Sequence, residues 1–290
     1  MGKNKKRQHY IWKFYLKPWT LNGILWCKRN NDEFKASLEN IGHKNYFYLT
    51  KPLNHIEQDF LVNLIKNQIP RENHFIIFQD MLLFCNFGDS SDEFTCKNGL
   101  ENYHSSMECN AVPFFELIYK KDTSFFSDTD SKVQFMHFIS MQYNRTKCMQ
   151  ERRKIAIRNF PMQPPPELIG KVDFENIFNA LTFSLFTNSI GNWLYSKAKM
   201  YFLETDYEFI TSDQPVINIH SGSLGSYDQV KDLELYYPVS PHLALFFTEK
   251  EFNTQKLDEC ITFQYNKLLF DKSYEQIYAL SKETLKSFQK

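Results

Sequence analysis

Apolar side chains recur along this chain at two spacings, and the order of the two predicts the fold class. From about residue 55 to residue 195 they recur every three or four positions, as on one helix face. After residue 199 they alternate with polar residues or form short blocks, which is typical of strands. Helices followed by strands indicate an α+β fold. We expect a helical N-terminal and central region packed on a mainly antiparallel sheet formed largely by the C-terminal half.

Prolines and polar runs divide the helical part of the chain. Pro70 ends the first helix, and Pro113 puts a break or kink into a later one. A polar, acidic stretch at 88–99 predicts a loop. The longest candidate begins in a run of N-cap residues and stops at Pro161. The expected helices cover residues 55–69, 75–87, 101–119, 130–159, 174–195 and 262–270, with a short one at the C-terminus.

Strands are expected at both ends of the chain. The turn signal Asn22-Gly23 predicts a hairpin near the N-terminus. Short connections favour antiparallel pairing among the C-terminal strands. The expected strands cover residues 24–27, 46–49, 200–204, 209–211, 216–219, 235–239, 243–248 and 276–279. The proline run at 161–166 is either a boundary or a stiff connector, and we expect a single domain over residues 1–290.

Charge is balanced overall but segregated along the chain. The 290 residues carry 34 Lys and Arg against 34 Asp and Glu, so no whole-molecule attraction to nucleic acid or an acidic membrane is expected. Residues 1–30 nevertheless hold eight basic residues and no acid, and residues 145–158 hold six against one. Residues 89–130 hold nine acids against three lysines. Local anion sites, or basic and acidic segments that pair within the chain or across a homo-oligomer, are therefore compatible with a net charge of zero.

The composition of the N-terminus and the spacing of the cysteines predict a cytoplasmic protein. The basic N-terminus is not followed by the apolar stretch of a secretory signal, and no apolar run is long enough to cross a membrane. The six cysteines form no CxxC pair and no zinc spacing, so we expect reduced thiols. No specific metal, phosphate-loop or nucleophile motif occurs, so the sequence identifies neither a cofactor nor a metal.

A basic and aromatic block at residues 7–17 is the first candidate site. Its Lys and Arg side chains can bind phosphate while Tyr10 and Tyr15 stack on bases. The alternative is an ordinary strand or helix edge, with the aromatic rings in the core and Lys13 in water. Neighbouring cations disfavour protonation of His9, which predicts a neutral imidazole.

Two further blocks offer charged side chains. On the long helix expected at 130–159, Arg145 shares a face with Cys148 and Met149 and points inward at an anion or a carboxylate, with the later basic residues in solvent. The alternative is a buried structural ion pair, for which Glu108 is the most obvious partner. Asp213 follows a strand and precedes Pro215, a position that presents an acid, a base or a metal ligand. Its alternative is an Asx-turn that caps its own backbone.

Taken in order, these blocks resemble the domain-of-unknown-function family 4238. The shared motifs are His9-Tyr10 through Phe14-Tyr15-Leu16-Lys17, Asn40-Ile41-Gly42 with Phe47-Tyr48, Met107-Glu108, Gln142 with Arg145-Thr146, Phe209 to Pro215, Pro238 with Ser240-Pro241, and Asn266. They span roughly residues 7–280. The chain departs from the family at Ile11-Trp12-Lys13, where Val-Pro-Gln is usual, and at Gln214, which replaces a frequent Asn. The resemblance implies an intracellular, mostly microbial protein without an agreed activity.

Polar motif residues from separate parts of the chain suggest one composite pocket. The catalytic candidates are His9, Asp213, Arg145 and Glu108, and the substrate-binding candidates are Tyr10, Lys13, Tyr15, Gln142, Ser212 and Asn266. In such a pocket His9 is a general base or acid, Asp213 orients it or binds a metal, and Arg145 stabilises negative charge. This predicts a hydrolase or nuclease acting on a phosphate-containing or nucleic-acid substrate, with a toxin or phage-defence effector as a setting.

Two alternatives to an enzyme stay open at this point. A binding module without catalysis would use the basic and aromatic N-terminus to contact nucleic acid or an acidic protein partner. A purely structural hypothesis assigns the same motif residues to buried polar networks that specify the fold. The three hypotheses differ in where the motif residues lie, because only the enzyme requires them around a shared, open cleft.

Overall fold

The computed structural model describes residues 5–49, 51, 53–69, 71, 93–159, 165–222, 232–253 and 256–289. The helix expected at 75–87 lies outside these ranges, as does most of the proline run at 161–166. Within them, helices and strands are largely segregated along the chain, and the sheets are antiparallel except for one short parallel pair. The predicted α+β class is confirmed.

The elements follow one another along the chain as the residue pattern largely predicts. The helices are α1 (Lys13–Leu16), α2 (His55–Gln68), α4 (Glu93–Tyr119), α5 (Thr129–Asn144), α6 (Lys147–Arg158), α7 (Phe174–Ser196), α8 (Glu259–Lys272) and α9 (Lys282–Lys286). Short 3-10 helices lie at Lys17–Trp19, Leu38–Asn40, Ser124–Ser127 and Pro166–Leu168. Helix α2 begins with a capping box, in which Asn54 and Glu57 bind each other's backbone N–H.

The described strands form three sheets. One is the pair β1 (Arg7–His9) and β4 (His43–Asn45). A five-stranded sheet has the order β10 (Lys256–Leu257), β5 (Lys199–Thr205), β9 (Leu243–Thr248), β8 (Leu235–Ser240) and β7 (Ile217–Asn218). A four-stranded sheet has the order β3 (Asp32–Ser37), β2 (Ile24–Arg29), β11 (Gln276–Ala279) and β6 (Thr211–Ser212).

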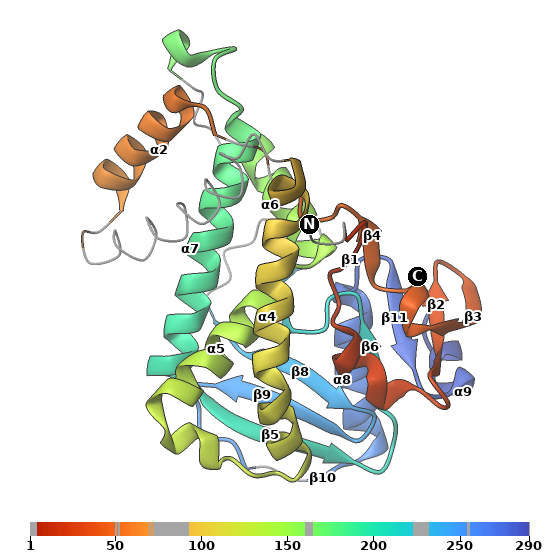
Figure 1. The fold of residues 1–290 in the computed structure, drawn as a ribbon. Helices are drawn as coiled ribbons and strands as arrows, with labels where there is room; N and C mark the ends of the chain where they lie inside the picture. Colours follow the sequence, from red (N-terminus) through yellow and green to blue (C-terminus); the bar gives the residue numbers. More distant parts are fainter. Residues whose placement is uncertain are drawn as a thin grey trace.

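The five-stranded sheet is covered on both faces. On β8, Leu235 and Tyr237 belong to the core shared with α4, α5 and α7, whereas Tyr236 belongs to a second cluster shared with α8. The residues of β9 alternate in the same way. Figure 1 shows α4, α5 and α7 over one face of this sheet. Because both faces are buried, these strands are apolar at nearly every position.

The two ends of the chain meet in the four-stranded sheet. Strands β2 and β11 pair antiparallel, with Cys27 opposite Tyr278 and Arg29 opposite Gln276. On its other edge β11 pairs with the short β6, which leads into Asp213. The N-terminal motif, the motif around Asp213 and the C-terminal strand therefore lie close together in space.

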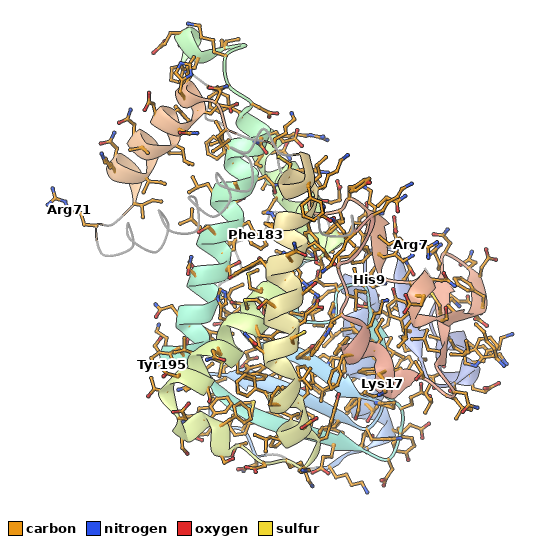
Figure 2. The ribbon with its side chains drawn as sticks, in the orientation of Figure 1. Arg7, His9, Lys17, Arg71, Phe183 and Tyr195 are labelled. Carbon is orange, nitrogen blue, oxygen red and sulfur yellow. The ribbon has the colours of Figure 1, made fainter. Side chains whose placement is uncertain are left out.

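The N-terminal strands also contact α4. The side-chain amide of Gln8 donates to the carbonyl of Lys97 at 2.5 Å and accepts from the backbone N–H of Tyr48 at 2.7 Å. Figure 2 shows His9 on β1 to the right of α4 and Phe183 on α7 to its left. The segment that follows β4 also faces α7, because Tyr48 and Phe183 line the same cleft.

Two predictions for the N-terminal half of the chain are wrong. The strand expected at 46–49 is a turn that follows β4, since Tyr46 has a φ of 48° and so leaves the extended conformation. The loop expected at 88–99 is wrong for residues 93–99, which form the first turns of α4. A polar residue of this stretch binds the N-terminal segment: Asn98 Oδ1 accepts from the backbone N–H of Lys5 at 2.8 Å.

The single helix expected at 130–159 is two helices. Helix α5 ends at Asn144, Arg145 is its C-cap, and α6 begins at Lys147. Thr146 caps α6 by accepting from the backbone N–H of Met149 at 3.3 Å, and its hydroxyl donates to Gln214 Oε1. The expected alignment of Arg145 with the residues after it on one helix face is therefore wrong.

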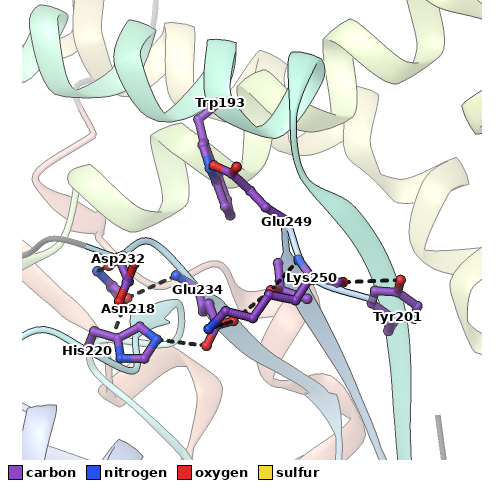
Figure 3. Close-up of polar contacts among 9 residues, drawn as sticks. Trp193, Tyr201, Asn218, His220, Asp232, Glu234, Glu249 and Lys250 are labelled. Atoms are coloured by element: carbon purple, nitrogen blue, oxygen red, sulfur yellow. Dashed lines mark hydrogen bonds and ion pairs between the residues drawn. The ribbon is translucent and has the colours of Figure 1, made fainter. Parts of the chain in front are cut away.

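A buried carboxylate ties the segment after β7 to the five-stranded sheet. Glu234 accepts hydrogen bonds from Thr248 Oγ1 at 2.7 Å and Lys250 Nζ at 3.2 Å, and lies 2.7 Å from His220 Nε2 (Figure 3). Burial raises the pKa of this carboxyl, but the hydrogen bonds from Thr248, His220 and Lys250 outweigh it, so the pKa lies below its usual value.

This arrangement predicts an acid-sensitive contribution to stability. A lowered carboxyl pKa stabilises the fold above the unfolded-state pKa, and the contribution is lost as the pH falls through the folded-state pKa. We expect Glu234→Gln to destabilise the protein by about 1–2 kcal/mol at neutral pH, and the difference from wild type to shrink below about pH 4. Thermal denaturation at the two pH values measures this. The control is Glu249→Gln, because glutamine can still accept from Trp193 Nε1, which lies 2.7 Å from Glu249. An undiminished difference in acid would contradict the prediction.

Candidate anion-binding site

Arg145 is buried and paired with Glu108. It is 4% exposed, its Nη2 donates to Glu108 Oε1, and its Nε has no hydrogen-bond partner in the part of the chain that the structure describes. Burial lowers the pKa of the guanidinium, but Glu108 raises it above its usual value, so the charge is retained. The structure thus contains the ion pair that was the alternative for this residue, and it joins the basic segment 145–158 to the acidic segment 89–130.

Arg153 is a second buried guanidinium, and its surroundings differ from those of Arg145. It is 6% exposed, Nε donates to Asn179 Oδ1 at 3.0 Å, and Nη1 donates to the Asn144 carbonyl at 2.9 Å. The guanidinium also lies 5.2 Å from the centre of the Phe183 ring. No carboxylate in the described part of the chain pairs with it. Burial lowers its pKa to about 10, so it is still charged at neutral pH. The expectation that the later basic residues face solvent is wrong for Arg153.

Both guanidinium groups line one cleft, which we call the Arg145 cleft. Its wall includes Tyr48, His104 and Asn179, and its free volume is about 90 Å³. That volume holds several water molecules or one group of phosphate size, but not a whole nucleotide. Lys51 stands at the rim, paired with Asp173 at 2.5 Å.

His104 adds an unsatisfied polar group to this cleft. It is 2% exposed, and neither ring nitrogen has a hydrogen-bond partner among the described residues. Burial, followed by the charge of Arg145, keeps its pKa well below the usual value, so the imidazole is neutral. The Tyr48 ring lies 4.4 Å away, centre to centre. A neutral imidazole offers one N–H donor, and a buried donor without a partner requires an explanation.

Helix α4 brings two carboxylates to the same face as His104. Glu101, His104 and Glu108 are spaced three and four residues apart, which aligns them along one side of a helix. Burial, followed by repulsion from Glu108, raises the pKa of Glu101 to about 7. Glu101 therefore populates both protonation states at neutral pH, as an acid–base group requires. Sequence reasoning missed Glu101, His104 and Arg153, although the spacing on α4 was a usable signal for the first two.

His9 and Lys13 lie outside the Arg145 cleft. His9 is half-buried beside His43, with ring centres 5.3 Å apart. Burial, followed by the charges of Lys13 and His43, lowers its pKa to about 4, so the imidazole is neutral as the sequence predicts. Lys13 pairs with Glu39 at 2.5 Å. Neither residue lines the cleft.

Asp213 anchors a different segment of backbone. It is fully buried, Oδ1 accepts from the N–H of Tyr274 at 2.8 Å, and Oδ2 accepts from Glu275 and Gln276 at 2.6 and 3.0 Å. It does not cap its own turn, so that alternative is wrong. The hydrogen bonds of the carboxylate go to the backbone of residues 274–276, and no hydrogen bond joins Asp213 to His9 in the described ranges. Among the described residues, no group of three or more His, Cys, Asp and Glu is arranged to hold a metal ion.

The other candidates mostly hold the segment 209–214 in place. The hydroxyl of Tyr15 lies 2.5 Å from that of Thr211 and donates to the Pro238 carbonyl at 2.7 Å. The Ser212 hydroxyl donates to the Gln214 carbonyl at 2.9 Å. Asn266 accepts from the N–H of Ile210 at 2.9 Å and donates to the Glu208 carbonyl at 2.8 Å. Gln142 is buried, and within the described ranges neither the oxygen nor the nitrogen of its amide has a hydrogen-bond partner. Tyr10 lines a separate pocket.

The expected single composite pocket is therefore wrong. Arg145 lines the cleft and Glu108 is bound to it as its ion-pair partner, whereas Tyr10 and the segment held by Asp213 belong elsewhere. Residues 7–283 match the model of a family described as "Protein of unknown function (DUF4238)". The chain belongs to this family. No curated protein and no solved structure matches the DUF4238 chain. In its described part, no helix combines the length and the apolar character that crossing a membrane requires.

Proposed function

We propose that this DUF4238 protein is a hydrolase, nuclease-like in its chemistry, that binds a phosphate group of its substrate in the Arg145 cleft. The observation that carries the proposal is the buried guanidinium of Arg153, which lines the cleft and pairs with no described carboxylate. A buried charge is costly unless a counter-ion neutralises it. A bound phosphate is such a counter-ion, and a planar guanidinium can bind it through two N–H groups.

The remaining groups suit hydrolysis of a phosphate ester. Arg153 and Arg145 stabilise the charge that develops on the phosphoryl oxygens, and the N–H of His104 adds a neutral donor. Glu101 is the acid–base group: as a carboxylate it accepts a proton from the attacking water, while the phosphorus–oxygen bond to the leaving group breaks. We place the general base here rather than at His9, because Glu101 shares a helix face with His104, which lines the cleft, and His9 does not line it.

The size of the cleft bears on the substrate. A free volume of about 90 Å³ admits the phosphate but leaves the rest of the substrate outside. Nucleic acid, whose phosphates project from its surface, meets this condition. The proposal includes a cytoplasmic setting and a role as a toxin or phage-defence effector, in which cleavage of nucleic acid is the damaging reaction.

Arg153→Gln tests the phosphate site directly. We expect the substitution to weaken binding of inorganic phosphate at least about tenfold, since a hydrogen bond to a charged group is lost. We also expect the ligand-free protein to be as stable as wild type or more so, because an uncompensated buried charge is removed. Calorimetric titration and thermal denaturation measure the two effects. Arg158→Gln, at an exposed position of the same helix, is the matched control. A loss of stability with unchanged phosphate binding would contradict the proposal.

Glu101→Gln tests the chemistry. Removal of a general base commonly slows a reaction by about 100-fold or more, so we expect that loss in kcat on a phosphodiester substrate such as single-stranded RNA. Phosphate binding is expected to persist, because Arg145 and Arg153 are unchanged. Full activity of the Glu101→Gln protein would exclude this residue as the base.

A further inference from the structure

A second pocket lies apart from the Arg145 cleft and shares none of its lining residues. It opens where β4, the end of β2, the start of α6 and the start of β11 meet, and we call it the Tyr10 pocket. Its volume is about 330 Å³. Small-molecule sites generally have volumes of about 300–1,000 Å³, so this pocket is large enough for one nucleotide.

Three cations from three separate elements line the Tyr10 pocket. Arg29 ends β2, Lys44 lies in β4, and Lys147 is the first residue of α6. The one acid of the lining, Glu275, pairs with Lys147 at 2.5 Å. In the described ranges, neither Arg29 nor Lys44 forms an ion pair. The pocket therefore has two positive charges that no described side chain neutralises.

Tyr10 places a hydroxyl donor in this positive pocket. The residue is 2% exposed, and its ring packs on Phe47 with centres 5.0 Å apart. Its hydroxyl hydrogen-bonds to no described residue, although the residue lines the pocket. Burial, followed by the charge of Asp213, raises its pKa, so the hydroxyl keeps its proton and is a donor. A protonated hydroxyl beside uncompensated cations is complementary to an oxyanion.

The geometry of the pocket depends on contacts made by residues that do not line it. Asp213 fixes the backbone of residues 274–276, and Glu275 and Gln276 of this segment line the pocket. Thr146 is bonded to Gln214, which fixes the start of α6 and so the position of Lys147. Thr146 therefore lies between Arg145, which lines the Arg145 cleft, and Lys147, which lines the Tyr10 pocket.

We propose that the Tyr10 pocket binds the phosphate of a nucleotide, either free or as one unit of a single-stranded nucleic acid. Arg29, Lys44 and Lys147 surround the phosphate, and the Tyr10 hydroxyl donates to one of its oxygens. The inference goes beyond the proposed function, because the site has its own residues and requires no catalysis.

Binding of two probes by the full chain tests the inference. The probes are AMP, measured by calorimetry, and a short fluorescein-labelled oligothymidylate, measured by anisotropy. Tyr10→Phe removes only the hydroxyl, so we expect an unchanged melting temperature and about tenfold weaker binding. Lys44→Gln changes an exposed side chain, which keeps the test valid even where Tyr10→Phe impairs folding. We expect it to weaken binding of the oligothymidylate and to reduce the salt dependence by about one ion. Lys267→Gln, at an exposed lysine of α8 outside the pocket, is the control.

The outcomes separate this site from the Arg145 cleft. Weaker binding by the Tyr10→Phe and Lys44→Gln proteins, with Arg153→Gln unaffected, supports the pocket whatever the fate of the proposed hydrolase. Binding of AMP alone identifies a free nucleotide as ligand, and binding of the oligothymidylate alone identifies a strand. Absence of binding to either probe, or binding that only Arg153→Gln weakens, would overturn the inference.

Discussion

Replacing Arg145 by methionine is expected to lower the free energy of unfolding by about 3–5 kcal/mol, because one partner of a buried ion pair would be removed. Glu108, whose side chain is 16% exposed, would then be a poorly hydrated carboxylate without its cation. The methionine side chain replaces most of the apolar stem of the arginine, so the lost stability is mainly electrostatic and not a packing defect. Urea denaturation followed by circular dichroism measures the change.

A second substitution distinguishes the ion pair from other roles of Arg145. Adding Glu108→Gln to Arg145→Met removes the unpaired charge, so we expect most of the lost stability to return. The double variant would then fold without the Arg145 guanidinium, and phosphate binding could be compared with wild type at similar stability. Equal stability of wild type and the Arg145→Met protein would show that the pair contributes nothing. A double variant no more stable than Arg145→Met would point to packing instead.

The sheet and the separate helices were predictable because their patterns depend on burial alone. Strands β8 and β9 are buried on both faces, and the apolar blocks at 235–239 and 243–248 show this directly. The predicted strand at 276–279 coincides with β11. The α5–α6 break was not predictable in the same way, since a side chain 68 positions away, Gln214, receives the bond that fixes Thr146. Only the folded chain brings these two residues together.

The site was predictable in part. Arg145 and Glu108 stand out as charged motif residues, and their pairing was one of the alternatives the sequence offered. Arg153 looked like one of several basic residues on a solvated face, because nothing local shows that it is buried. Its acceptors come from Asn144 on α5 and Asn179 on α7, so its position depends on tertiary packing. The prediction that all motif residues line one pocket is wrong. Some of them, such as Asn266, form hydrogen bonds with the backbone and line no shared cavity.

Truncating Asp213 to alanine is expected to destabilise the protein by about 4 kcal/mol or more, since three backbone N–H groups at the start of β11 would lose their acceptor in a buried site. Asp213→Asn should destabilise the protein less than Asp213→Ala, because the amide oxygen of asparagine still accepts a hydrogen bond. It should still be less stable than wild type, because the NH₂ group then faces a backbone N–H donor. Burial raises the pKa of Asp213 to about 6, although the three N–H groups act in the opposite direction.

The pH dependence of this effect has the opposite sign to that of Glu234. A raised carboxyl pKa means that the folded protein binds the proton more tightly than the unfolded chain, so the stabilising contribution falls as the pH rises from about 4 to about 6. We therefore expect the stability difference between wild type and Asp213→Ala to be larger at about pH 4.5 than at pH 7, in urea denaturation at both values. A difference that instead grows with pH would mean that the carboxylate form is the one the three N–H groups hold. If Asp213→Asn folds and retains full hydrolysis of RNA, this residue organises the backbone around the Tyr10 pocket and takes no part in the reaction.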